Sequence, residues 1–190
     1  MARTFFFCIK YSKKTPFAIA MIKTTTILFL ALIAQSSLVA QEAATISSAE
    51  ITFVYRSNDT DGSISGFSSS SSIVLDDPSN SVFEGEVQAN TIETGNFLRN
   101  WSLRGSKYFD VEKFPKIKFA STKVTLTDGG YAVEGNLTIK DTTKPITIKF
   151  TKNGKTLTGT TTLFSSDYGI NVKKKREDNK VSVKMVFVLQ

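Results

Sequence analysis

Histidine is absent from this 190-residue chain, and cysteine occurs only once, as Cys8. Beyond Cys8 the chain therefore has no thiolate or imidazole ligands for a metal such as zinc, and it lacks the nucleophile–histidine pairs of common hydrolases. A single cysteine also excludes a disulfide within the chain. The fold must rest on its own hydrophobic core, and hydrolytic functions are disfavoured.

The first forty residues have the layout of a targeting region. Residues 21–23 give a positive start, residues 26–34 form a compact apolar run, and small residues follow up to a suitable cleavage position. This order is typical of a secretory signal peptide, and the apolar run is short for a membrane span. We expect a start at Met21, a leader over residues 1–40, and a periplasmic or secreted domain over residues 41–190. An uncleaved membrane anchor is the alternative.

The formal net charge of +7 belongs mainly to this leader. Its five basic residues have no acidic counterpart, so the remaining domain carries only +2. A nucleic-acid partner inferred from the high isoelectric point would therefore be misplaced. The basic run at residues 173–176 is interpreted as a solvated hairpin loop, with peripheral contact to anionic lipid as the alternative.

Alternating apolar and polar residues indicate that the domain consists mostly of strands. In the last segment Val183, Met185 and Phe187 fall on one side, as the two-residue period of a strand requires. Asn153 and Gly154 form a strong two-residue hairpin turn. We count about eight strands with short turns, which predicts an all-β antiparallel domain. Periodicity alone allows either a barrel or a sandwich.

One segment interrupts the strand pattern with a short helix. Phe97, Leu98 and Trp101 are spaced three and four residues apart, which gathers them on one side of a helix. Gly105 stands where a helix commonly stops. An aromatic insert of this kind favours a lid over an apolar space, with ordinary core packing as the alternative.

Three blocks of the chain resemble the signature of the YceI-like, polyisoprenoid-binding family. They are NTIETGN with YFDVEKFP (residues 90–96 and 108–115), GNLTIKDTTKPIT (residues 135–147) and DYGI (residues 167–170). The resemblance covers residues 49–190. It implies a lipocalin-like antiparallel barrel with a short helical insert, and a long isoprenoid chain held in an internal apolar tunnel.

The candidate ligand-binding residues are the inward-facing apolar positions of the strands together with the apolar residues of the insert. They are Phe53, Phe83, Phe97, Leu98, Trp101, Phe109, Phe114, Phe119, Tyr131, Leu137, Ile148, Phe150, Met185 and Phe187. A barrel of about eight strands either encloses one small ligand or is filled by its own side chains. The volumes that decide between these cannot be derived from the sequence.

Two arginines flank the helical insert. Arg99 and Arg104 are candidates for orienting a polar ligand head, such as a quinone carbonyl or a phosphate. Alternatively, they pair with Asp110 or Glu112 and fix the insert in place. The family often has a histidine where this chain has Ser102, which removes any headgroup contact through imidazole.

The preferred interpretation is an exported carrier that holds a polyisoprenoid, quinone or similar lipid and is not an enzyme. The second interpretation is a structural or stress-response barrel with a solid core that acts through its surface. A third, acid–base chemistry at Asp110 or Tyr168, is disfavoured because nothing pairs these residues at a recognisable spacing. We expect no cofactor and no metal, and we leave a homodimer open.

Overall fold

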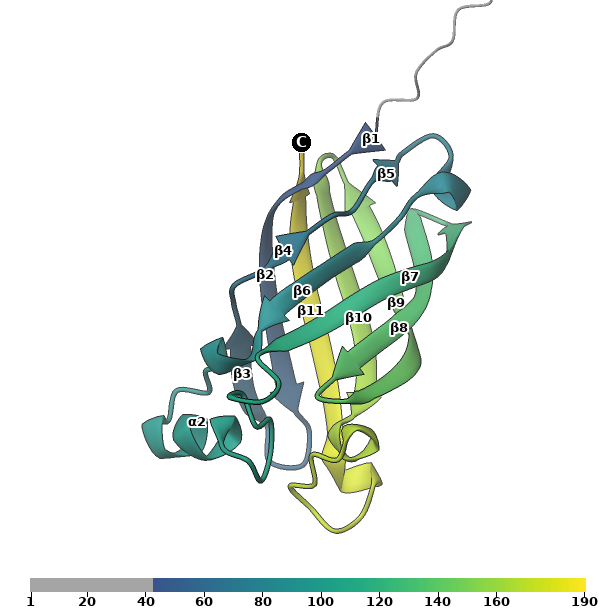
Figure 1. The fold of residues 1–190 in the computed structure, drawn as a ribbon. Coiled ribbons are helices and arrows are strands. Elements are labelled where there is room, and N and C mark those ends of the chain that lie inside the picture. Colours follow the sequence, from purple (N-terminus) through teal and green to yellow (C-terminus); the bar gives the residue numbers. More distant parts are fainter. Residues whose placement is uncertain (1–42) are drawn as a thin grey trace, which may run out of the picture. The chain divides into compact units, whose positions relative to one another are not determined.

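Strands form where apolar and polar residues alternate, and they curl into a barrel (Figure 1). The computed structural model describes residues 43–190, so the expected leader and the start at Met21 lie outside the described residues. The strands are β1 (Ala43–Ala44), β2 (Ile46–Tyr55), β3 (Thr60–Ile64), β4 (Ser68–Ser69), β5 (Ile73–Val74), β6 (Glu84–Gln88), β7 (Lys116–Thr127), β8 (Gly130–Ile139), β9 (Thr142–Asn153), β10 (Thr156–Phe164) and β11 (Lys180–Leu189). The described helices are α2 (Phe97–Arg104) and the short 3-10 turns η1 (Pro78–Asn80), η2 (Ala89–Thr91), η3 (Ser165–Tyr168) and η4 (Glu177–Asn179).

The main sheet is antiparallel throughout, and its two edge strands, β3 and β4, follow each other in the chain. Its nine strands follow the order β3-β2-β11-β10-β9-β8-β7-β6-β4. The two ends of the sheet meet next to β3. There the amide of Gln88, the last residue of β6, donates to the carbonyl of Ser65, directly after β3, at 3.1 Å. A bridge between Ser63 and Glu93 continues this seam. The expected all-β, lipocalin-like antiparallel barrel is confirmed.

One half of the barrel is filled with the protein's own side chains. Ile73, Val133 and Leu157 are completely buried there, and Tyr131 is 3% exposed. Gly159 of β10 is needed in this region, because a Cβ at that position would lie 2.4 Å from the ring of Phe150. Close packing of this kind provides the hydrophobic stabilisation of a domain that has no disulfide.

Helix α2 and the segment between β10 and β11 lie at the other end of the barrel (Figure 1). The two regions contact each other, since Tyr108 and Phe109, after α2, pack against a cluster that contains Tyr168 and Ile170. Among residues 43–190, no helix is long and apolar enough to cross a membrane. This end of the barrel carries the candidate site.

Candidate functional site

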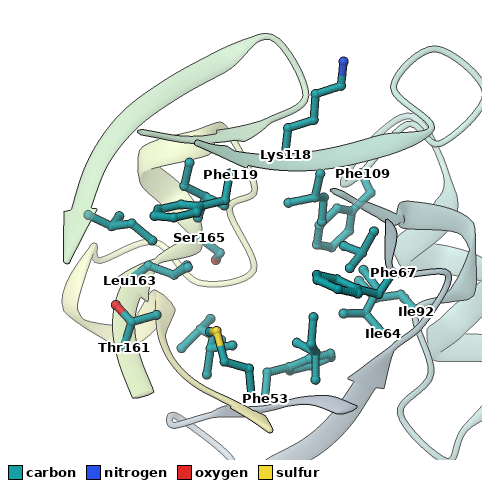
Figure 2. A pocket seen from close by; sticks show the side chains of 18 of the residues that line it. Phe53, Ile64, Phe67, Ile92, Phe109, Lys118, Phe119, Thr161, Leu163 and Ser165 are labelled. Carbon is teal, nitrogen blue, oxygen red and sulfur yellow. The ribbon is translucent and has the colours of Figure 1, made fainter. Parts of the chain in front are cut away.

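The half of the barrel nearest to α2 is hollow. It contains a cavity of about 440 Å³, which falls in the usual size range of small-molecule sites, roughly 300–1,000 Å³. Figure 2 shows the lining side chains arranged around an open centre. The solid barrel of the second interpretation therefore describes only one half of this domain.

The walls of the cavity come from strands all around the barrel. Phe53 on β2, Ile64 on β3, Phe119 on β7 and Leu163 on β10 point towards the same space (Figure 2). They do so because successive side chains of a strand alternate between the inner and outer faces of the sheet. The ammonium group of Lys118, also at the cavity edge, points away from its centre (Figure 2). The interior is therefore an apolar surface.

A cluster of phenylalanine rings forms the inner end of the cavity. The rings of Phe67 and Phe187 stack with their centroids 5.2 Å apart. Phe83 stacks on Phe150 at the same separation, and Phe150 contacts Phe187 at 5.7 Å. All four line the cavity, and the filled half of the barrel lies behind them. The cluster therefore limits the depth of the cavity.

The opposite end of the cavity is bordered by the helical insert and by the segment after η3. Leu103 of α2, Phe109 and Ile170 contribute apolar surface there. Polar side chains appear at the same end, among them Arg99 and Thr94. A ligand in this cavity would thus have apolar walls along its length and polar groups near α2.

Helix α2 is held on the barrel by polar contacts. Its first turn is capped by Asn96, whose side chain accepts from the amide of Arg99 at 2.9 Å. Asn100, which is 5% exposed, donates to Glu93 and accepts from the hydroxyl of Thr94 at 2.7 Å. At the end of the helix, the guanidinium of Arg104 donates to the carbonyl of Ile92 at 2.9 Å.

Most of the sequence-predicted strand positions border the cavity. Those that line it are Phe53, Phe83, Phe119, Leu137, Ile148, Phe150, Met185 and Phe187, together with Phe109 from the insert. The two candidate headgroup residues have different surroundings. Arg99 is exposed at the edge of the cavity, whereas Arg104 does not line the cavity and fixes the insert through its hydrogen bond to Ile92. Within residues 43–190 neither arginine forms an ion pair with Asp110 or Glu112.

The predicted apolar cap formed by Phe97, Leu98 and Trp101 is wrong. None of the three lines the cavity, and their side chains are 79%, 72% and 73% exposed. The spacing correctly placed them on one side of α2, but that side faces solvent. The inner side is taken by Asn100 and Leu103, because hydrogen bonds to the preceding segment fix the rotation of the helix.

Two further candidates lie outside the cavity. Tyr131 points inward as predicted, but it stands near the start of β8, opposite Phe150, in the filled half of the barrel. Alternation specifies the face of a strand and not the position along the barrel axis. Phe114 is half-buried at the end of the insert, with the ammonium of Lys113 5.1 Å from its ring centroid.

Several lining residues were missing from the predicted set. Ile64 and Phe67 flank Gly66, where the chain bends between β3 and β4, and Gly66 has φ +71°. Ile92 and Ile170 lie on irregular segments, where no period of two exists. The only sequence signal for these four residues is an apolar side chain next to polar turn residues, and this signal is too weak to predict a place in the cavity lining.

Most of the perturbed titratable groups lie away from the cavity lining; the exception is Tyr55, which lines the cavity and whose pKa is raised by burial. Hydrogen bonds from Asn100 and from the amide of Gly95 lower the pKa of Glu93, and the guanidinium of Arg176 lowers the pKa of Asp167. Burial raises the pKa of Tyr168 to about 12. None of these three residues lines the cavity, and residues 43–190 contain no group of three or more metal-ligating side chains. The arrangement is suited to holding an apolar molecule by contact.

The family comparison matches nearly all of the described domain. A model of the YceI-like domain matches residues 40–189. Curated relatives include a UPF0312 protein of Yersinia pestis, 38% identical over 69 residues, and one of Yersinia enterocolitica, 36% identical over 69 residues. Each alignment covers 36% of this chain and 36% of the relative, so the match spans about a third of the length of these curated relatives.

Solved structures share the fold at low identity. BcnA of Burkholderia cenocepacia matches with a TM-score of 0.64 and 20% identity, covering 74% of this chain and 95% of that protein. The YCEI protein of Campylobacter jejuni matches with a TM-score of 0.55 and 16% identity, over 68% and 82%. A polyisoprenoid binding domain from Saccharophagus degradans matches with a TM-score of 0.51 and 12% identity, over 78% and 97%.

Proposed function

Because the chain belongs to the YceI-like family, we propose that it is an exported lipid carrier that holds one polyisoprenoid, quinone or similar chain in its barrel. The observation that carries this proposal is the apolar cavity of about 440 Å³. The polyisoprenoid binding domain from Saccharophagus degradans, which shares the fold, supports the choice of ligand class. The leader-like residues 1–40 support export to the periplasm or the medium.

The cavity walls supply affinity without specific polar recognition. Each CH₂ group transferred from water to this surface contributes about 0.8 kcal/mol. Binding should therefore strengthen with the length of the hydrocarbon until the chain reaches the phenylalanine rings at the inner end. Beyond that length, further groups stay in water and add no affinity.

The polar end of the ligand would lie near α2. Arg99 borders the cavity there and is exposed, so its guanidinium is free to meet a carbonyl or phosphate oxygen. Arg104 already donates a hydrogen bond to the carbonyl of Ile92, which holds the insert on the barrel. Of the two tentative headgroup residues, Arg99 is the one we retain.

Binding without chemical conversion is the role that fits these groups. The carboxylates with lowered pKa values, Glu93 and Asp167, do not line the cavity. Tyr168, considered for acid–base chemistry, is buried in a cluster beside the cavity. A carrier needs only shape and apolar surface, and both are present.

The test is the lipid content of the purified full chain. Native mass spectrometry and solvent extraction should find one lipid per chain, or the emptied protein should take up added ubiquinones and polyprenols. Affinity should rise with the number of isoprene units and then level off. A protein that is free of lipid and takes up no member of either series would overturn the proposal.

A further inference from the structure

The outer face of α2 is an exposed apolar surface with no partner in the described chain. Phe97, Leu98 and Trp101 form this face, and each is more than 70% exposed. Large apolar side chains gathered in this way usually mark an interaction site. We call these three residues the outer face of α2.

The rotation of α2 is the reverse of that expected for a helix on a soluble domain. Such helices turn their apolar stripe towards the core and their polar side towards water. Here a polar residue, Asn100, is buried and hydrogen-bonded to Thr94 at 2.7 Å, while Trp101 next to it is exposed. The polar anchors at Asn100 and Arg104 hold the apolar side outward, so its exposure is built into the fold.

Basic residues lie on α2, on the segment that follows it and on the loop after η3. Arg99 lies on α2 itself, and Lys107 and Lys113 follow on the insert. The loop after η3 adds a second group, residues 173–175, next to Val172, which is 40% exposed and borders the same cavity as α2. No lysine of this second group forms an ion pair within residues 43–190.

The acidic groups of this end are partly neutralised. Glu93 accepts from the amides of Thr94 and Gly95 at 3.0 and 2.8 Å. Asp167 is held by two hydrogen bonds from Arg176, at 2.7 and 2.6 Å. Asp110, Glu112, Glu177 and Asp178 also lie on these segments and form no ion pair within residues 43–190, so residues 93–115 and 167–178 together carry a small positive formal charge of +2.

We propose that the outer face of α2 docks on an anionic phospholipid bilayer, with the lysines of residues 173–175 against the headgroups. Tryptophan and phenylalanine next to basic residues are the composition of surfaces that bind the membrane interface. A second copy of the chain is a poorer occupant, because three side chains fall far short of the roughly 800 Å² per partner that a stable dimer needs. Docking here brings the polar end of the cavity to the membrane.

This inference goes beyond the carrier function and is tested separately from it. Trp101 is the only tryptophan in the chain, so fluorescence reports on this face alone. Added to the full chain, vesicles of 70% phosphatidylcholine and 30% phosphatidylglycerol should shift the emission to shorter wavelength. Phospholipids brominated on the acyl chains should quench it. The emission shift reports the surroundings of Trp101 itself, which does not line the cavity.

Variants separate the apolar and electrostatic parts of the docking. Phe97→Ser should weaken partitioning to these vesicles about tenfold, whereas Leu126→Ser, at another exposed apolar site at the far end of β7, should leave it unchanged. Replacing Lys173 by Gln should weaken partitioning about fivefold at low salt, and less at high salt.

Three results would overturn the inference. The first is an unchanged Trp101 spectrum with the anionic vesicles. The second is a blue shift that depends on protein concentration without vesicles, which would assign the face to a second copy. The third is equal loss of partitioning in the Phe97 and Leu126 variants, which would mean that the outer face of α2 has no special part.

Discussion

The ring of Phe83 lies against the ring of Phe150, with centroids 5.2 Å apart and planes inclined by 22°. Both rings line the cavity, and both belong to the core cluster that fills the other half of the barrel. The pair therefore stands between hollow and solid parts of the same interior. The depth available to a ligand depends on these rings.

Shortening one of these rings should lengthen the cavity. Phe83→Ala removes a ring that lines the cavity and belongs to the same core cluster as Ile73, and we expect a loss of about 3–5 kcal/mol in unfolding free energy. The isoprenoid length at which affinity levels off should increase. Urea unfolding and a chain-length series measure the two effects. In Val124→Ala, which alters the core away from the cavity, the length at which affinity levels off should not change. An unchanged profile in Phe83→Ala would mean that the rings do not limit the ligand.

Filling the cavity should block binding without harming the fold. Val183 of β11 is half-buried and lines the cavity, so a phenylalanine there has room to occupy the hollow. We expect uptake of a quinone to fall at least about tenfold while unfolding free energy stays within about 1 kcal/mol or rises. Val188→Phe, on the outer face of the same strand, is the matched control and should bind normally. Equal binding by both variants would place the ligand elsewhere.

The side of each strand that faces the interior could be predicted from the sequence. Met185, Phe187 and Ile148 point inward because the period of two is fixed by strand geometry. Their depth could not be predicted, since it depends on how strands are staggered around the barrel. This is why Tyr131, which also points inward, lies in the solid half, whereas Ile148, two residue pairs further along the ladder between β8 and β9, borders the cavity.

The rotation of α2 could not be predicted either. An apolar stripe is normally evidence for the buried face, and Phe97, Leu98 and Trp101 form such a stripe. The decisive contacts are hydrogen bonds from the helix to Glu93 and to the carbonyl of Ile92. These partners sit on an irregular segment whose path is set by the closed barrel and not by local sequence.

The contact between Arg104 and the carbonyl of Ile92 should be needed to hold the insert. Arg104→Ala leaves that buried carbonyl without its donor, and we expect a loss of about 1–3 kcal/mol in unfolding free energy. Hydrogen exchange should also quicken at the amides of Phe109 and Val111, which bond to the last residues of α2. Arg99→Ala removes an exposed side chain of the same type and should change stability by less than about 0.5 kcal/mol. Similar effects of the two variants would contradict an anchoring role.

Tyr168 offers a test of burial without hydrogen bonding. Its hydroxyl is buried and has no hydrogen-bond partner within residues 43–190, although the ring packs against Ile139 and Ile170. Tyr168→Phe keeps the ring and removes the unsatisfied group, so at pH 7 stability should stay equal or rise by about 1 kcal/mol. Urea unfolding at pH 7 measures this. A loss of more than 1 kcal/mol would reveal a bond made by the hydroxyl.

The same substitution should change how the protein responds to alkali. Burial raises the pKa of Tyr168 from 10.0 to about 12, so the folded state keeps the phenol proton where the unfolded chain releases it. Because the unfolded state then binds fewer protons, stability is fully present below pH 10 and declines as pH rises towards 12. The loss from this group is on the order of 2 kcal/mol by pH 12. Burial also raises the pKa values of Tyr55 and Tyr131, so part of the decline remains in Tyr168→Phe. Denaturant unfolding between pH 9 and 12 should show a shallower slope for the variant; parallel curves would mean that Tyr168 ionises equally in both states.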